Sequence, residues 1–355
     1  VWSAFGSADE ASSPEVSSTE ASGLASSNAG AAGVAGGSAE LAAPLPTWLS
    51  ETGLYVRGTQ EIAPRVLTFS PQYPLWTDGA TKRRFVLLPE GAAIDAADVD
   101  AWDFPVGTRF WKEFSFGRRV ETRYMERLPD GTWRYATYRW TEDERDAQLM
   151  AAAETALVPL EGGALHEVPS ESDCRACHDS KTTPVLGFTT LQLSPDRDPN
   201  APHGERVREG DVDLASLAAR GLLTRFPKAL LTTPPRIEAK SPRERAALGY
   251  LYGNCGGCHN TQGVIASVGL DFDQRFGEGA GHRVLETTQD VQIRYVIPGE
   301  RQSVRIAPSK PDESVVVHRM GSRFAAAQMP PLGTRAVDEE ALELVRSWIA
   351  HDLHR

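Results

Sequence analysis

The four cysteines of this 355-residue chain form two pairs, and a histidine directly follows each pair. The two motifs read Cys174-Arg-Ala-Cys177-His178 and Cys255-Gly-Gly-Cys258-His259. Thiolate and imidazole are ligands that hold transition metals, and the thiolate is also the nucleophilic form of cysteine. Two thiols about one helical turn apart are placed to bond to one planar group, while the adjacent imidazole reaches a metal at its centre. The motifs therefore predict chemistry based on a metal and on covalent bonds to sulfur.

Cys-x-x-Cys-His is the attachment signature of c-type haem. The histidine then binds the iron from the proximal side. We expect two covalently attached haem c groups, held by two sets of residues: Cys174, Cys177 and His178, and Cys255, Cys258 and His259. Three other interpretations stay open: one zinc site, for which 255 − 174 = 81 residues is a wide gap, a thioredoxin-type redox pair, and two strained disulfides within the pairs.

The distal iron ligands are predicted from the remaining methionines and histidines. Met329 follows His259 by 329 − 259 = 70 residues, in the sequence Gln-Met-Pro-Pro-Leu-Gly. The prolines hold such a loop rigid and keep a weak thioether donor on the iron. We expect Met329 to bind the second haem, with His318 and Met320 in reserve. For the first haem a five-coordinate iron and four ligands stay open: Met125, Met150, His166 and His203.

Composition divides the chain into four segments. Residues 1–45 are rich in Ser, Ala and Gly and predict a disordered tether. We interpret Val1 as a mature N-terminus from which an export signal has been removed. Residues 46–165 predict a β-rich domain, residues 166–240 hold the first motif and a connecting segment, and residues 241–355 predict a helical module.

The β-rich segment holds six of the eight tryptophans. Aromatic and β-branched runs predict strands over 110–116, 120–128 and 133–140, and Pro129-Asp-Gly131 predicts a turn between the last two. We expect an antiparallel domain of the β-sandwich type within an α+β multidomain protein. The dense aromatics are more typical of a core than of a sugar-binding platform.

Helices are predicted on both sides of the second motif. Ser241 is suited to cap a helix that has Pro242 at its first position and that leads, over 242–251, into Cys255. A last helix over about 338–353 has apolar residues at helical spacing. Residues 242–355 resemble the c-type cytochromes, in which an N-terminal and a C-terminal helix pack across one another beside the haem. The resemblance implies a cytochrome c-like domain.

A larger part of the chain, most of residues 70–350, resembles a group of uncharacterised exported bacterial proteins. The stretches that carry the resemblance are YPLWTDGATKRRFVLLPEG, WDFPVGTRFWKEFS, ETRYMERLPDGTWRYATYRWTEDERDA and VLGFTTLQLS. That group combines an N-terminal β-rich domain with a C-terminal cytochrome c-like domain. The resemblance implies this architecture and work beside a periplasmic sugar or alcohol dehydrogenase, and it brings no established reaction.

Charge and hydropathy limit the partners. The net charge of −11 argues against binding to nucleic acid or to anionic lipid, since both need a basic face. No stretch approaches the ~20 consecutive apolar residues of a membrane span. We expect a periplasmic or extracellular electron carrier whose partner is a redox protein such as a periplasmic dehydrogenase. The alternatives are a di-haem peroxidase that uses His166 with Glu167, and a β domain that binds a carbohydrate or another polymer.

Overall fold

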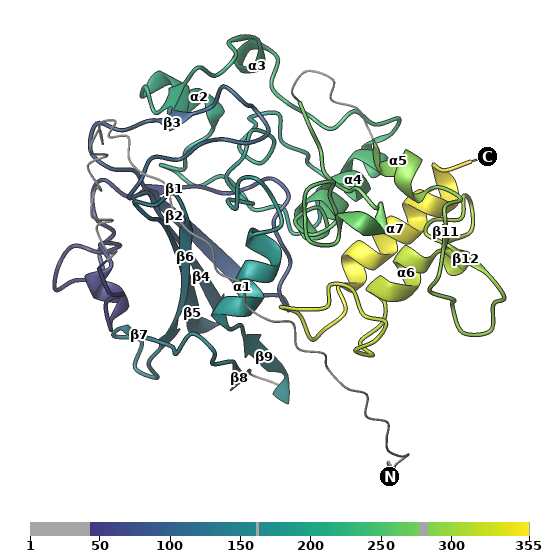
Figure 1. Ribbon diagram of the computed structural model, residues 1–355, viewed down its shortest axis with the longest axis horizontal. Helices are drawn as coiled ribbons and strands as arrows, with labels where there is room; N and C mark the ends of the chain where they lie inside the picture. The colour runs from purple at the N-terminus through teal and green to yellow at the C-terminus, as the bar shows by residue number, and fades with distance from the viewer. Residues whose placement is uncertain (1–42, 161–162, 277–282, 355) are drawn as a thin grey trace, which may run out of the picture. The chain divides into compact units, whose positions relative to one another are not determined.

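The computed structural model describes residues 43–160, 163–276 and 283–354. Its N-terminal part holds an antiparallel sheet of six strands in the order β1-β2-β4-β5-β6-β7 (Figure 1). The strands are β1 (Leu67–Thr68), β2 (Thr81–Leu87), β4 (Arg109–Phe116), β5 (Arg118–Arg127), β6 (Trp133–Trp140) and β7 (Ala147–Leu149). The three predicted strands are confirmed as β4, β5 and β6, which pair antiparallel in chain order.

The other strands of the described residues form sheets of two strands each. They are β3 (Ile94–Asp95) with β10 (Leu223–Thr224), β8 (Ala156–Pro159) with β9 (Leu165–Val168), and β11 (Gln292–Ile293) with β12 (Ser303–Val304). The antiparallel β region is thus confirmed, but the structure differs from the predicted sandwich in its second layer, which would need another large sheet. Side chains between Cys174 and Leu217, from helices and from irregular chain, instead cover the face of the sheet that carries Phe110 and Met125.

Both faces of the six-stranded sheet are buried. Cross-strand neighbours on one face are Phe85, Trp111, Tyr124 and Ala136, and those on the other face are Val86, Phe110, Met125 and Tyr135. The rows separate because successive side chains of a strand point to opposite faces. The face that carries Met125 is the one on which the first motif packs, since Cys174 belongs to the same cluster of buried side chains.

The first motif lies in α1 (Glu171–His178), which contacts β6 (Figure 1). Ser170 begins this helix: its side chain accepts a hydrogen bond from the Asp173 N–H, and the Asp173 carboxylate accepts one from the Ser170 N–H at 3.0 Å. This reciprocal pair satisfies two N–H groups that would otherwise lack a partner at the helix start. Two short helices follow, α2 (Leu214–Ala219) and α3 (Ala229–Thr232).

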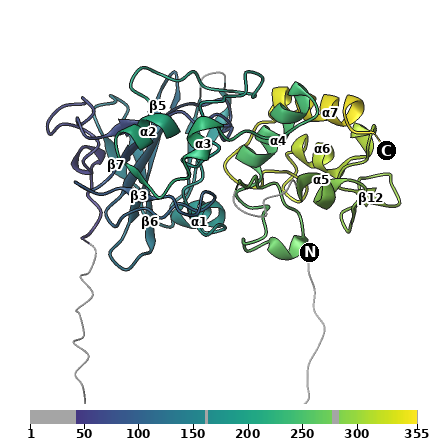
Figure 2. The same ribbon diagram turned by 90° about the horizontal axis from the view of Figure 1, so that it is seen from above.

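The C-terminal part is smaller and helical. Its helices are α4 (Pro242–Asn254), α5 (Arg283–Thr288), α6 (Val315–Met320) and α7 (Glu339–His351). The short 3₁₀ turns of the described residues, in both parts, are η1 (Leu49–Glu51), η3 (Ala266–Val268) and η4 (Pro311–Glu313). Figure 2 shows α4, α6 and α7 gathered in one group, and both α4 and α6 contact α7. The predicted helices at 242–251 and 338–353 are confirmed as α4 and α7, with shifted ends.

Two glycines of α4 let the segment that begins at Tyr73 lie directly against this helix. A Cβ atom on Gly249 would overlap the Tyr73 ring, and one on Gly253 would overlap the Tyr73 carbonyl. The Trp76 N–H also donates to Asn254 Oδ1 at 2.7 Å. The end of α4, and with it the start of the second motif, is therefore fixed against the segment that leads into β2.

The tether predicted for residues 1–45 lies outside the described residues apart from its last three positions. Among the residues that the structure describes, no helix has the length and apolar character needed to cross a membrane.

Candidate functional site

The structure brings the two motifs together, although 81 residues separate Cys177 from Cys258. The Sγ atoms of these two residues are 3.8 Å apart, and the Cys258 Sγ also lies 3.8 Å from the Ala176 carbonyl oxygen. All four cysteines are free thiols. The second cysteine of one motif therefore faces the second cysteine of the other.

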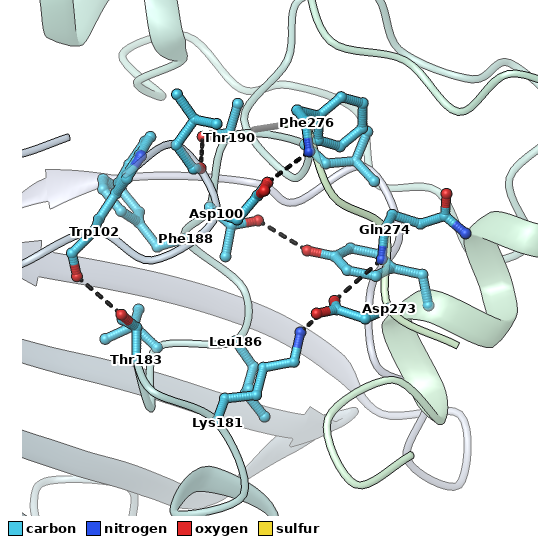
Figure 3. Close-up of a pocket in the computed structure, with 15 residues that line it drawn as sticks. Asp100, Trp102, Lys181, Thr183, Leu186, Phe188, Thr190, Asp273, Gln274 and Phe276 are labelled. Atoms are coloured by element: carbon cyan, nitrogen blue, oxygen red, sulfur yellow. Dashed lines mark hydrogen bonds and ion pairs between the residues drawn. The ribbon is translucent and has the colours of Figure 1, made fainter. Parts of the chain in front are cut away.

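The segments that follow the two motifs hold this arrangement in place. Gln262 Oε1 accepts hydrogen bonds from the Thr182 N–H at 3.2 Å and from its hydroxyl at 2.8 Å. Lys181 Nζ lies 2.5 Å from Asp273 Oδ1, an ion pair that Figure 3 shows beside a small pocket. Gly263 lies so close to Ser180 that an added Cβ would be 2.9 Å from its carbonyl oxygen.

The pocket of Figure 3 lies where three segments of the chain meet. Trp102, Phe188 and Phe276 are among its lining residues. Its volume is about 30 Å³, a few times the roughly 10–15 Å³ that one water molecule needs. This pocket is thus a gap in a packed seam and is too small for a cofactor.

A much larger cavity, of about 190 Å³, lies beside the first motif. Cys174, Cys177 and His178 line it from α1. Opposite residues from the sheet include Phe110, Met125 and Tyr135, and the loop before α7 contributes Pro330, Leu332, Gly333 and Thr334. The cavity is therefore built by the sheet, by the first motif and by the C-terminal part together.

His178 is oriented by the backbone. Its Nδ1 is 2.6 Å from the Pro184 carbonyl oxygen, which accepts a hydrogen bond from the Nδ1–H tautomer. Burial, together with the nearby cations Lys112 and Arg123, lowers the pKa of His178 to about 4 against the opposing effect of that carbonyl. The imidazole is then neutral and its Nε2 lone pair is free, which is the state a metal ligand needs.

His259 has a different environment. Its Nδ1 is buried and has no hydrogen-bond partner among the described residues. Its ring lies edge-on to Phe272, with the ring centres 6.0 Å apart. Burial, with a smaller effect of Arg319 and Arg305, lowers the pKa of His259 to about 4. This imidazole is also neutral, but nothing described fixes its tautomer.

The thiols are mostly protonated where they are buried. Burial raises the pKa of Cys174 and raises that of Cys255 to about 12. The contact with Cys258 and burial raise the pKa of Cys177, whereas the same contact lowers the pKa of Cys258. Cys258 is therefore the thiol of this pair that ionises first.

Met329 is half-buried in the loop between α6 and α7, and its N–H donates to the Arg319 carbonyl at 2.9 Å. Pro330 and Leu332, just after it, line the cavity of the first motif. The assignment of Met329 to the second haem stays a prediction. Of the reserve ligands, Met320 is buried in the helical core, and the His318 ring lies 5.8 Å from the Tyr295 ring.

Of the four distal candidates for the first haem, Met125 lines the cavity. His166 is fully buried and its Nε2 lies 3.0 Å from Glu121 Oε1. His203 Nε2 lies 2.9 Å from the Asp338 carboxylate. Met150 packs against a separate small cluster that includes Val158. The structure therefore places Met125 beside the first motif and gives both histidines carboxylate partners.

Sequence reasoning missed three cations of the cavity wall, Arg84, Lys112 and Arg123. The alternating pattern of residues 109–116 places Lys112 on the same face as Phe110 and Phe114. That alternation was the available signal. The contact of His178 with the Pro184 carbonyl has no side-chain signature and could not be found this way.

The structure also bears on the zinc interpretation. The wide gap between the pairs does not keep them apart, since Cys177 and Cys258 meet. Even so, no group of three or more His, Cys, Asp and Glu side chains is arranged to hold a metal ion within the described ranges. A metal held only by protein side chains therefore has no formed site there.

Comparison with family models, with curated proteins and with solved structures found no match to this chain.

Proposed function

We propose that this chain is an exported c-type cytochrome that carries two haem c groups and transfers electrons between protein partners. The observation that carries the proposal is the cavity lined by Cys174, Cys177 and His178, beside which the Pro184 carbonyl orients the His178 imidazole through its Nδ1. Residues 241–355 are the cytochrome c-like domain of this proposal, and residues 46–165 supply the sheet that walls the first site.

The residues present fit such a group. Cys174 and Cys177 would form its thioether bonds at the first site and His178 would bind its iron, with Cys255, Cys258 and His259 in the same roles at the second. A haem supplies one-electron exchange between ferric and ferrous iron. The wall of the cavity is apolar along Phe110, Met125 and Tyr135, as the porphyrin face requires.

The contact of Cys177 with Cys258 supports transfer between the two sites. The Sγ atoms that would form one thioether bond of each group lie 3.8 Å apart in the chain. Gln262, Asp273 and their partners Thr182 and Lys181 hold this junction rigid. The residues on both sides thus shorten the path for an electron between the sites.

The partner of the proposal is a redox protein, such as a periplasmic dehydrogenase, that meets the chain outside the cytoplasm. The net charge of −11 would attract a basic partner over long range. We therefore expect the rate of electron transfer to fall as ionic strength rises.

Two alternatives are less well supported. For a peroxidase, His166 would have to serve as the acid–base group, yet it is enclosed by Glu121, and Glu167 pairs with Arg335 at 2.5 Å. For a polymer-binding β domain, an exposed row of tryptophans would be needed. Four of the six are buried, and they are Trp102, Trp111, Trp133 and Trp140.

The proposal is tested by counting haem in protein made in a bacterial host that matures c-type haem. We expect two thioether-linked haems per chain by pyridine haemochrome assay and by mass. The variants C174S/C177S and C255S/C258S should each keep one, while H351A, which changes an exposed histidine, keeps both. Bound zinc or four free thiols in the wild-type chain would overturn the proposal.

A further inference from the structure

Three cations stand directly opposite one another on neighbouring strands of the sheet. Arg84 of β2 is paired in register with Lys112 of β4, and Lys112 with Arg123 of β5. All three line the cavity beside the first motif. Like charges directly opposite one another destabilise a sheet, so this row, which we call the cation row, calls for neutralising anions.

The protein neutralises only the two ends of the cation row. Arg84 Nη1 lies 2.8 Å from Glu205 Oε2, and Arg123 Nη2 lies 2.6 Å from Glu121 Oε1. The side chain of Arg84 is 5% exposed, and its Nη2 is buried without a hydrogen-bond partner among the described residues. One donor of the row is thus buried and unused.

Lys112 is the middle member of the row. Its Nζ lies 4.9 Å from the centre of the Phe114 ring, and the described residues give it no ion pair. Burial and the neighbouring cations Arg84 and Lys82 hold the pKa of Lys112 well below its usual range, and Glu205, a carboxylate that acts against them, is already paired with Arg84. An anion bound beside Lys112 would restore its charge.

Two carboxylates of the cavity wall are committed elsewhere. Glu167 pairs with Arg335 at 2.5 Å, and Asp173 accepts hydrogen bonds from the Ser170 N–H and hydroxyl at 3.0 and 2.7 Å. Neither is a partner of the cation row. The anion that the row lacks must therefore come from a ligand.

The wall of the cavity indicates the shape of that ligand. The row Val86, Phe110, Met125 and Tyr135 lies two residues along the same face from the cation row. An apolar strip and a cationic strip thus run side by side across the sheet. A ligand that fits both has a flat apolar body and carries carboxylates at one edge.

We propose that Arg84, Lys112 and Arg123 form a carboxylate-binding site of the first-motif cavity. Where a haem is held by Cys174 and Cys177, its two propionates are the carboxylates bound, and this part rests on the proposed function. A free organic carboxylate is the other source of the same chemistry, and the experiment separates the two.

The first arm uses the haem-loaded chain and the variant K112M. We expect K112M to keep two haems, because the thioether bonds do not involve Lys112. In the wild-type chain the propionates stay ionised and the midpoint potential of the first haem is flat between about pH 5 and 8. In K112M the pKa of a propionate rises into that range, so the potential falls below the wild-type value at high pH and climbs as pH decreases.

The matched control is R83Q. Arg83 is on the same strand as Arg84 but is exposed and stacks on Phe85, 5.0 Å from the ring centre, on the opposite face. The R83Q substitution removes one positive charge at a similar place in the sequence, and the Arg83 side chain does not line the cavity. A pH-dependent potential in K112M but not in R83Q supports propionate binding at the cation row.

The second arm titrates succinate into the C174S/C177S chain, which lacks the first haem, and into haem-loaded wild type, by calorimetry. If the C174S/C177S chain binds succinate and the added K112M substitution abolishes this binding, the carboxylate site is supported whatever the first arm shows. Binding to the haem-loaded chain as well would identify a free carboxylate as the ligand. A potential unchanged by K112M together with no succinate binding to either chain overturns the inference, while the haem count alone decides the proposed function.

Discussion

Buried charges lie beside the first motif, whereas the end of α4 that leads into the second motif packs through glycine, alanine and large apolar side chains, and the buried Glu244 and Arg245 lie at the start of that helix. On the sheet, Arg84 and Glu121 are 5% and 0% exposed. In the helical part, Ala247, Val345 and Trp348 are fully buried around α4 and α7. The surroundings of the first Cys-x-x-Cys-His motif are therefore held by electrostatic pairing, and those of the second by close packing.

The two histidines show the same difference. His178 is held through its Nδ1 by a backbone carbonyl, but the buried Nδ1 of His259 has no described partner. The chain itself thus orients the imidazole of the first motif, whereas no described residue orients that of the second. Substitutions in the two regions should fail for different reasons, and the following predictions test that contrast from the largest effect to the smallest.

The largest loss is expected for E121A, in the region of the first motif. Glu121 is fully buried between Arg123, at 2.6 Å, and His166, at 3.0 Å. Its removal leaves the charge of Arg123 without a partner inside the protein, which should cost about 3–5 kcal/mol of unfolding free energy. Urea denaturation followed by tryptophan fluorescence measures this loss.

The control for E121A is E90A. Glu90 pairs with Arg65 at 3.3 Å, but its side chain is 89% exposed. An exposed pair contributes at most about 1 kcal/mol, so E90A should leave the unfolding midpoint almost unchanged. Equal losses of unfolding free energy in E121A and E90A would mean that the buried charges do not stabilise the region of the first motif more than exposed charges do.

A smaller loss is expected for G249A, in the region of the second motif. A Cβ at this position would overlap the Tyr73 ring, so that α4 and the segment before β2 must move apart. Alanine improves helix propensity by about 1 kcal/mol, and overpacking typically costs about 1–3 kcal/mol, which leaves a net loss of roughly 2 kcal/mol or less.

The matched control for G249A is G321A, because Gly321 also has a right-handed backbone and an added Cβ would meet Leu342 at an ordinary 3.4 Å. The free energy of unfolding of G321A should lie within about 0.5 kcal/mol of the wild-type value, as is usual for surface substitutions. If the two alanine variants behave alike, close packing of Tyr73 does not position α4.

The elements with local signals were predictable. The aromatic and β-branched runs at 110–116, 120–128 and 133–140 and the turn at 129–131 predict β4, β5 and β6, and the capping Ser241 with Pro242 predicts α4. The cysteine spacing alone picked out both motifs. Each of these features is encoded by residues that lie next to one another in the chain.

The arrangement of the motifs was not predictable in the same way. The contact between Cys177 and Cys258 spans 81 residues and depends on how the sheet, α1 and α4 pack. The expected sandwich differs in its second layer, because irregular chain around Phe188 takes the place of a second sheet. To predict the cation row, one must know the register of three strands, because the position of Lys112 in its own strand shows only which face it occupies.

The smallest effects are expected for the serines that begin α1 and α4, and they compare the helix that holds the first motif with the helix that leads into the second. Ser170 accepts from the Asp173 N–H at 3.3 Å, whereas Ser241 accepts from the Glu244 N–H at 3.0 Å and also donates to Asp352 Oδ2 at 2.6 Å. Loss of a cap costs about 0.5–2 kcal/mol. S241A should fall in the middle of this range and S170A at its lower end, because only Ser241 also ties the start of its helix to the end of α7. Thermal unfolding of both variants beside wild type measures the order, and a larger loss in S170A would show that α1, despite its eight residues, depends on its own cap more than on the sheet it packs against.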